Sequence, residues 1–238
     1  MSLVLLLTAT IKPFLGGTES RRTNVLERED DYFKTINFYL NKGYKVVFVE
    51  NSNYNSMRIS SIVNISSFEY HTFISKSSHL GKSAGELEIL EYANTHSKFL
   101  QEVDYLIKIT GRYIIKNIDS LLEKTNKVEH EVYINPTRNL RWADTRIIII
   151  RKTYYFNYFL PCAKKYLDES KNVFLENVFM RSLFFYMIDG GNLNLWPVYP
   201  AYDAFDGTHN EKVSFNTFKT LKYNLYYKFK KFVFKHRA

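Results

Sequence analysis

The chain has 238 residues, 45% of them hydrophobic and 17% aromatic, which suits a globular domain with a real core and excludes a disordered chain. Its one cysteine, Cys162, excludes an intrachain disulfide, and no apolar run approaches the roughly 18 residues that a membrane-spanning helix needs. The formal net charge is +9, and the segment after Glu211 carries seven Lys, one Arg and no acid. We therefore predict a nearly neutral domain over 1–211 and a strongly basic tail over 212–238.

Strands and helices are expected to alternate along the first half of the domain. The opening apolar run is predicted as a buried strand rather than a signal peptide, because no basic segment precedes it. The glycines of 81–85 mark a loop. The alternation predicts an α/β fold with a mostly parallel, doubly wound sheet. Strands are expected at 4–8, 44–49, 68–74 and 105–109, and helices at 26–41, 86–100 and 118–124.

The second half is expected to extend this sheet and cover it with two longer helices. The run of isoleucines after Arg146 is typical of a strand that is buried on both faces. Strands are predicted at 131–135, 146–151 and 193–198, and helices at 154–167 and 173–188.

Polar clusters follow three of the predicted strands, at 8–10, 50–52 and 108–113. In open α/β sheets, ligands bind outside the carboxyl ends of the strands. The coincidence of these clusters with strand ends therefore predicts a ligand site at that edge of the sheet.

The stretch from Lys108 to Tyr113 is the most informative of these clusters. Alternation along a strand places Lys108 and Thr110 on one face, Gly111 permits a tight turn, and Arg112 follows. Two cations and a hydroxyl at a strand end suit a diphosphate. The alternative is a solvated strand end with a turn glycine.

Two acidic residues are candidates for the chemistry. Asp144 stands with Arg146 before the isoleucine strand, and Glu176 stands in the first turn of a predicted helix. The structural alternatives are an exposed ion pair for Asp144 and an interaction with the helix dipole for Glu176.

The tail is predicted to be a basic amphipathic helix. Its lysines lie off a narrow apolar stripe, a composition typical of helices that lie in the plane of a membrane surface. The alternative is a helix that packs this stripe on the domain. The stripe consists of Phe218, Leu221, Leu225, Phe229 and Phe232.

In order and spacing, these motifs resemble a family of bacterial glycosyltransferases from O-antigen and capsule gene clusters. The resemblance covers about residues 3 to 200, and its specific element is the Lys-x-Thr-Gly-Arg-Tyr motif that begins at Lys108. It implies one Rossmann-like domain of the glycosyltransferase A type. The same resemblance places this motif where related enzymes carry a metal-binding Asp-x-Asp pair. We therefore expect no required cofactor, with Mg²⁺ or Mn²⁺ optional.

The resemblance also implies a nucleotide-sugar donor and a lipid-linked glycan acceptor, used on the cytoplasmic face of the plasma membrane, to which the tail attaches peripherally. We expect Glu176 to be the catalytic base, with Asp144 as second choice or as a sugar ligand. The rival hypothesis is a nucleic-acid-binding module that uses the basic aromatic tail. The expected donor-binding residues are Thr8, Thr10, Glu50, Asn51, Gly81, Lys82, Gly85, Glu86, Lys108, Thr110, Gly111, Arg112, Tyr113 and Arg146.

Overall fold

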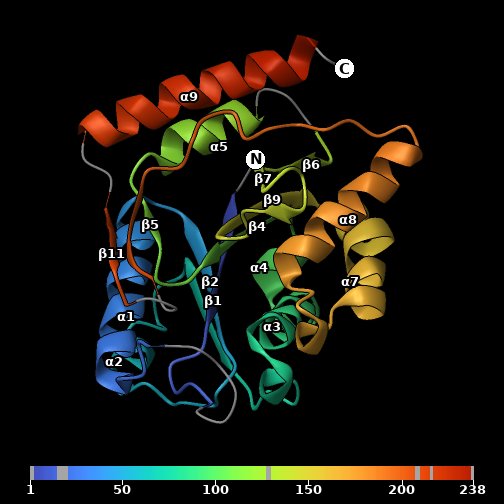
Figure 1. The fold of residues 1–238 in the computed structure, drawn as a ribbon. Helices are drawn as coiled ribbons and strands as arrows, with labels where there is room; N and C mark the ends of the chain where they lie inside the picture. The colour runs from blue at the N-terminus through green and yellow to red at the C-terminus, as the bar shows by residue number, and fades with distance from the viewer. Residues whose placement is uncertain (1–2, 15–20, 127–129, 207–209, 215–216, 237–238) are drawn as a thin grey trace.

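A central six-stranded sheet organises the molecule (Figure 1). The computed structural model describes residues 3–14, 21–126, 130–206, 210–214 and 217–236. The strands of this sheet are β1 (Val4–Ala9), β2 (Lys45–Glu50), β3 (Phe68–Thr72), β4 (Tyr105–Thr110), β6 (Val132–Tyr133) and β9 (Ile147–Arg151). Their order is β3-β2-β1-β4-β9-β6, and all neighbours are parallel except at β9, which runs antiparallel to both β4 and β6. The predicted α/β fold with a mostly parallel sheet is confirmed.

Helices cover both faces of the sheet, because the side chains of its strands alternate between two apolar cores. In β1, Leu5 and Leu7 point into one core, and Val4 and Leu6 point into the other. The first core is covered by α1 (Val25–Asn41) and α5 (Ile118–Asn126), and the second by α3 (Lys82–His96), α7 (Leu160–Tyr166) and α8 (Leu175–Ile188).

Smaller elements complete the described chain. The short helices are α2 (Met57–Ser60), α4 (Lys98–Gln101) and α6 (Lys152–Tyr154). A second sheet has the order β11 (Lys212–Ser214), β10 (Tyr202–Phe205), β5 (Ile114–Ile115), and a two-stranded sheet pairs β7 (Pro136–Thr137) with β8 (Trp142–Ala143). Because β11 pairs with β10, the first residues assigned to the tail belong to a sheet of the domain.

Four element predictions were wrong. The expected helix at 86–100 is broken at Ser97, whose extended backbone separates α3 from α4. The expected loop at 81–85 is the first turn of α3, which Gly81 enters at a φ of 138° that favours glycine. The carboxylate of Glu169 accepts the backbone N–H of Ser83 and so caps this helix. The expected helix at 154–167 is interrupted by a π-helical turn over Tyr155–Phe159. No strand forms at 193–198, where the buried Trp196 precedes Pro197, which has no N–H for a ladder.

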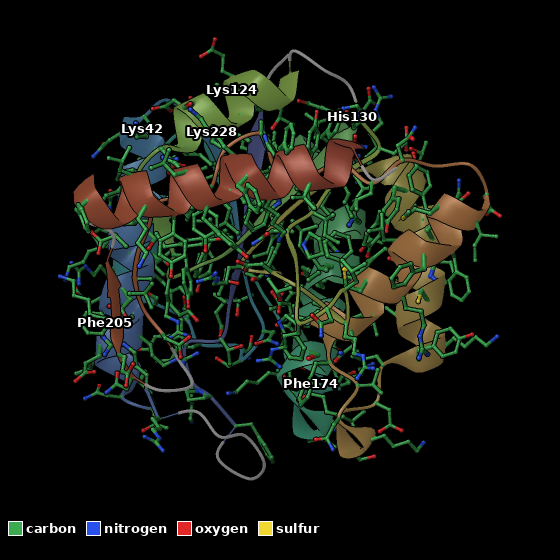
Figure 2. All side chains as sticks on the ribbon, turned by 45° about the horizontal axis from the view of Figure 1, so that its top comes forward. Lys42, Lys124, His130, Phe174, Phe205 and Lys228 are labelled. Atoms are coloured by element: carbon green, nitrogen blue, oxygen red, sulfur yellow. The ribbon has the colours of Figure 1, made fainter. Side chains whose placement is uncertain are left out.

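The predicted C-terminal helix is present as α9 (Thr217–His236), which crosses the top of the molecule in Figure 1 and its front in Figure 2. It packs on the domain through Tyr227, which is 3% exposed, and through Tyr223, which stacks on Tyr199. Lys230 donates to the side-chain oxygen of Asn135 at 2.7 Å. The face that meets the domain is therefore built from tyrosines and lysines.

The apolar stripe of α9 lies on the outward face. All five of its side chains are more than half exposed, so the alternative in which the stripe packs on the domain is not what the structure shows. Lys222 and Lys228 are exposed on the same helix, and the side chains of Lys219 and Lys235 lie outside the described part of the chain. Among the described residues, no helix combines the length and the apolar character that crossing a membrane requires.

Candidate functional site

A cavity of about 270 Å³ lies at the carboxyl ends of β1, β2 and β4. The chain passes from β1 outward to β2 and β3 and then returns to β4 on the other side of β1, so β1 and β4 flank a topological switch point. Such a point is where open α/β sheets bind ligands. The predicted site residues that line the cavity are Thr8, Thr10, Asn51, Gly81, Lys82, Gly85, Glu86, Thr110, Arg112, Tyr113, Arg146 and Glu176.

Four predicted site residues lie outside this cavity lining, and two of them shape its rim. Glu50 is fully buried, and its carboxylate accepts from the backbone N–H groups of Ile11 and Tyr54 at 2.9 and 3.0 Å. It therefore fixes the loops that follow β1 and β2. Gly111 donates its N–H to the Thr8 carbonyl at 2.9 Å, an approach so close that a Cβ would collide with that oxygen.

Asp144 is the third residue outside the lining. Its two carboxylate oxygens bind the Arg146 guanidinium, with Nε to Oδ1 at 2.8 Å and Nη2 to Oδ2 at 2.5 Å. The structure therefore pairs Asp144 with Arg146, as the ion-pair alternative expected, although Asp144 is buried and Arg146 is half-buried. Arg146 also lies over the ring of Tyr202 at 4.1 Å.

Lys108 is the fourth, and it does not reach the position expected of a phosphate ligand. It is fully buried because β4 lies between β1 and β9 with both faces of the sheet covered. Its ammonium binds the Glu86 carboxylate, the hydroxyl of Thr110 at 3.1 Å and the carbonyl of Thr145 at 2.8 Å. These acceptors occupy all of its donors.

The cationic side of the cavity is formed by Arg112 and by Arg28 of α1, which the sequence analysis missed. Arg28 donates Nε to the Thr10 carbonyl at 2.8 Å, and both guanidinium groups lie 5.9 Å from the ring of Tyr32. Burial lowers the pKa of Arg28, and the charge of Arg112 lowers it further. Nε and Nη1 of Arg112 are buried and have no hydrogen-bond partner among the described residues. Buried donors without partners are costly, so this arrangement favours an anionic ligand.

The acidic side is formed by Glu86 of α3 and Glu176 of α8. Glu176 accepts from the hydroxyl of Thr145 at 3.0 Å, and Glu86 accepts from Thr8 at 3.4 Å. Burial raises the pKa of Glu176, and the negative charge of Glu86 raises it further. A carboxyl group with a raised pKa is a stronger base once it is ionised, which suits proton transfer near neutral pH.

A preformed cluster of metal ligands is not found among the described residues of this site. No three acidic, His or Cys side chains among them gather where they could hold an ion. Asp144 is engaged by Arg146, and Asp104 precedes β4 and is therefore at the other end of that strand.

Further cavity residues were absent from the sequence predictions. Arg28 could have been predicted from the sequence, because it stands four residues before Tyr32 on the buried face of α1. Charged residues are rarely buried unless they are paired or bind a ligand. The others come from loops or are brought in only by packing. They are Ala9, Pro13, Phe14, Tyr32, Ser78, Ile89, Thr145 and Asp206.

Neither a protein-family model nor a curated protein matches the chain. Solved structures do show similarity. A candidate nucleotide-diphospho-sugar transferase from Desulfovibrio desulfuricans G20 is 10% identical, over 82% of this chain and 80% of its own, with a TM-score of 0.46. A cytidylyltransferase from Leptospira borgpetersenii is 13% identical, over 90% and 82%, with a TM-score of 0.47. A nucleoside-diphosphate-sugar pyrophosphorylase from Vibrio cholerae RC9 is 11% identical, over 81% and 91%, with a TM-score of 0.40. Similarity at this level identifies neither a family nor an activity.

Proposed function

We propose that this protein is a glycosyltransferase that takes its sugar from a nucleotide-sugar donor. The observation that carries the proposal is the Arg112 guanidinium in the cavity at the switch point, whose Nε and Nη1 are buried and have no hydrogen-bond partner in the part of the chain that the structure describes. The diphosphate of a nucleotide sugar presents paired anionic oxygens that match the planar fork of an arginine. Arg28 adds a second positive charge beside the first, while its own N–H groups donate to the carbonyls of Thr10 and Arg22.

In the proposed reaction, an acceptor hydroxyl oxygen attacks the anomeric carbon of the donor sugar, and the bond from that carbon to the diphosphate oxygen breaks. Arg112 and Arg28 stabilise the negative charge that develops on the leaving diphosphate. The proton of the acceptor hydroxyl passes to the Glu176 carboxylate. The nucleoside lies against Thr8, Thr10 and Asn51, which line the cavity at the ends of β1 and β2.

We propose further that the acceptor is a lipid-linked glycan of bacterial surface polysaccharide synthesis, O-antigen or capsule, at the cytoplasmic face of the plasma membrane. The sequence resemblance supports the pathway, and the outward stripe of α9 supports the location. Exposed Phe229 and Leu225 offer apolar area to lipid, and exposed Lys228 offers attraction to anionic headgroups. Aliphatic Leu221 and Leu225 in this stripe fit lipid better than they fit nucleic-acid bases.

The donor proposal is tested by thermal shift with UDP-, GDP-, CMP- and TDP-sugars. A ligand at about 100 times its Kd stabilises the native state by roughly 2.7 kcal/mol, so at least one nucleotide sugar should raise the melting temperature clearly. Arg112→Ala should abolish this shift. Arg58→Ala, which removes an exposed arginine on α2 away from the cavity, should retain it.

The proposal is wrong if no nucleotide sugar shifts the wild-type protein, or if Arg112→Ala responds as the wild type does. If instead single-stranded nucleic acid stabilises the protein and variants of the α9 stripe lose that effect, the nucleic-acid-binding alternative is favoured.

A further inference from the structure

A buried hydrogen-bond network joins the two carboxylates of the cavity. Glu86 and Glu176 come from different helices, α3 and α8, and both line the cavity. Lys108 lies behind them and contacts Glu86 directly. It reaches Glu176 indirectly, because it binds the carbonyl of Thr145 at 2.8 Å while the hydroxyl of Thr145 donates to Glu176 at 3.0 Å.

The partners of the Lys108 ammonium hold its side chain in one rotamer. Its side chain is fully buried, and all of its ammonium donors are used by Glu86, Thr110 and Thr145. Any other rotamer would leave a buried charge without partners, which proteins avoid. A single ammonium therefore sets where both carboxylates stand.

The network also gives the two carboxylates different surroundings. Glu86 has the Lys108 ammonium as a direct partner, whereas Glu176 is joined to Lys108 through Thr145. Glu176 is raised in pKa by burial and by the charge of Glu86, while the Thr145 hydrogen bond and the charge of Lys108 act in the opposite direction. Two carboxyl groups with divergent environments commonly divide acid and base roles in an active site.

We infer that Glu86 and Glu176 form a divided carboxylate pair, in which Glu86, paired with Lys108, binds hydroxyls of the donor sugar and Glu176 accepts the acceptor proton. Lys108 is the positioning residue for both. The inference rests on the proposed glycosyl transfer and deepens it. It gives Glu86 the sugar-binding role that the sequence analysis left open for Asp144, whose carboxylate is engaged by Arg146.

Other charged groups face the pair across the cavity and belong to its electrostatics. The variants used below do not change these charged groups. The groups therefore affect the pKa of Glu176 in every variant alike, and they do not affect the differences between variants. They are Arg28 from α1, Lys82 from α3, Arg112 after β4, Arg146 before β9 and Asp206 after β10.

The test is a titration of the Glu176 carboxyl group by NMR, with ¹³C-labelled glutamate, in the wild type and in three variants. Glu86→Gln removes the neighbouring negative charge and should lower the pKa of Glu176. Thr145→Val removes the hydroxyl that stabilises the ionised form and should raise that pKa. Glu91→Gln makes the same change as Glu86→Gln on the same helix, where Glu91 pairs with Lys164 outside the cavity, and should leave the pKa unchanged.

The acidic limb of kcat/KM should move in the same two opposite directions, and Glu86→Gln should raise the KM for the donor at least tenfold. A merely structural role would lower activity without these opposed shifts. If the pKa of Glu176 is unchanged in Glu86→Gln, the inference is wrong, whatever activity the enzyme has. If the pKa shifts occur but no nucleotide sugar binds, the proposed function falls and the coupled pair remains.

Discussion

The two faces of α9 predict opposite consequences for two aromatic substitutions on the same helix. Phe229 is 65% exposed on the outward stripe, whereas Tyr227 is 3% exposed against the domain. A buried aromatic side chain contributes roughly 200 Å², so at about 25 cal/mol per Å² the exposed part of Phe229 is worth about 3 kcal/mol if it enters lipid completely. A helix at the membrane surface immerses only part of that area. We therefore expect Phe229→Ala to lose about 1.5 kcal/mol, or roughly tenfold in vesicle affinity.

Tyr227→Ala should instead destabilise the fold. Truncating a buried aromatic residue costs about 3–5 kcal/mol, which for a chain of this size lowers the melting temperature by roughly 10 °C. Co-sedimentation with anionic vesicles and a melting curve for each variant measure both effects. Deleting the whole tail is a poorer test, because it also removes the β11 partner of β10 and uncovers Tyr199.

The reasoning is refuted if Phe229→Ala binds vesicles as tightly as the wild type. It is refuted equally if Phe229→Ala melts as low as Tyr227→Ala, since the stripe would then be part of the core. High salt should weaken wild-type binding, because it screens the lysines.

Further predictions concern the cavity. Arg112→Ala should fold normally and reduce transfer at least tenfold, which corresponds to about 1.4 kcal/mol of transition-state stabilisation; an unchanged kcat/KM would remove Arg112 from the mechanism. Glu176→Gln should lower kcat by about 100-fold while donor binding persists. If Glu176→Gln remains active and Asp144→Asn does not, Asp144 is the catalytic base instead. The same substitution should stabilise the protein at neutral pH. The fold favours the neutral carboxyl, so Glu176 contributes stability below its ordinary pKa of 4.5 and loses it as pH rises through the raised folded pKa. Activity should largely survive EDTA, and complete loss that Mg²⁺ or Mn²⁺ restores would show that a metal is required.

The sequence predicted the sheet well because its information is local. Buried parallel strands are short continuous apolar runs, and the polar residues that follow them mark one edge of the sheet. Thr8, Asn51 and Arg112 come from three such ends and meet in one cavity. The strands after residue 200 were missed because β10 and β11 are short, and their pairing depends on contacts with β5 that the sequence does not display.

The orientation of individual side chains was harder to predict. Alternation placed Lys108 and Thr110 on one face, but it did not show that this face is buried beneath α3 at Lys108 and open only at the strand end. A helical wheel found the stripe of α9 but carried no information on which face meets the domain. Arg28 belongs to a helix whose packing against β1 brings its guanidinium to the Thr10 carbonyl. Each of these depends on the sheet order, which is a non-local property.

The Glu169 carboxylate that caps α3 also affects where an anion can bind in the cavity. Aligned peptide dipoles place partial positive charge at the amino end of a helix, where anions commonly bind. Here Glu169 already accepts the Ser83 N–H at that end, so the backbone of α3 presents a neutralised terminus to the cavity. We therefore expect the anionic part of a bound molecule to be held by side chains such as Arg112 rather than by the backbone N–H groups of α3.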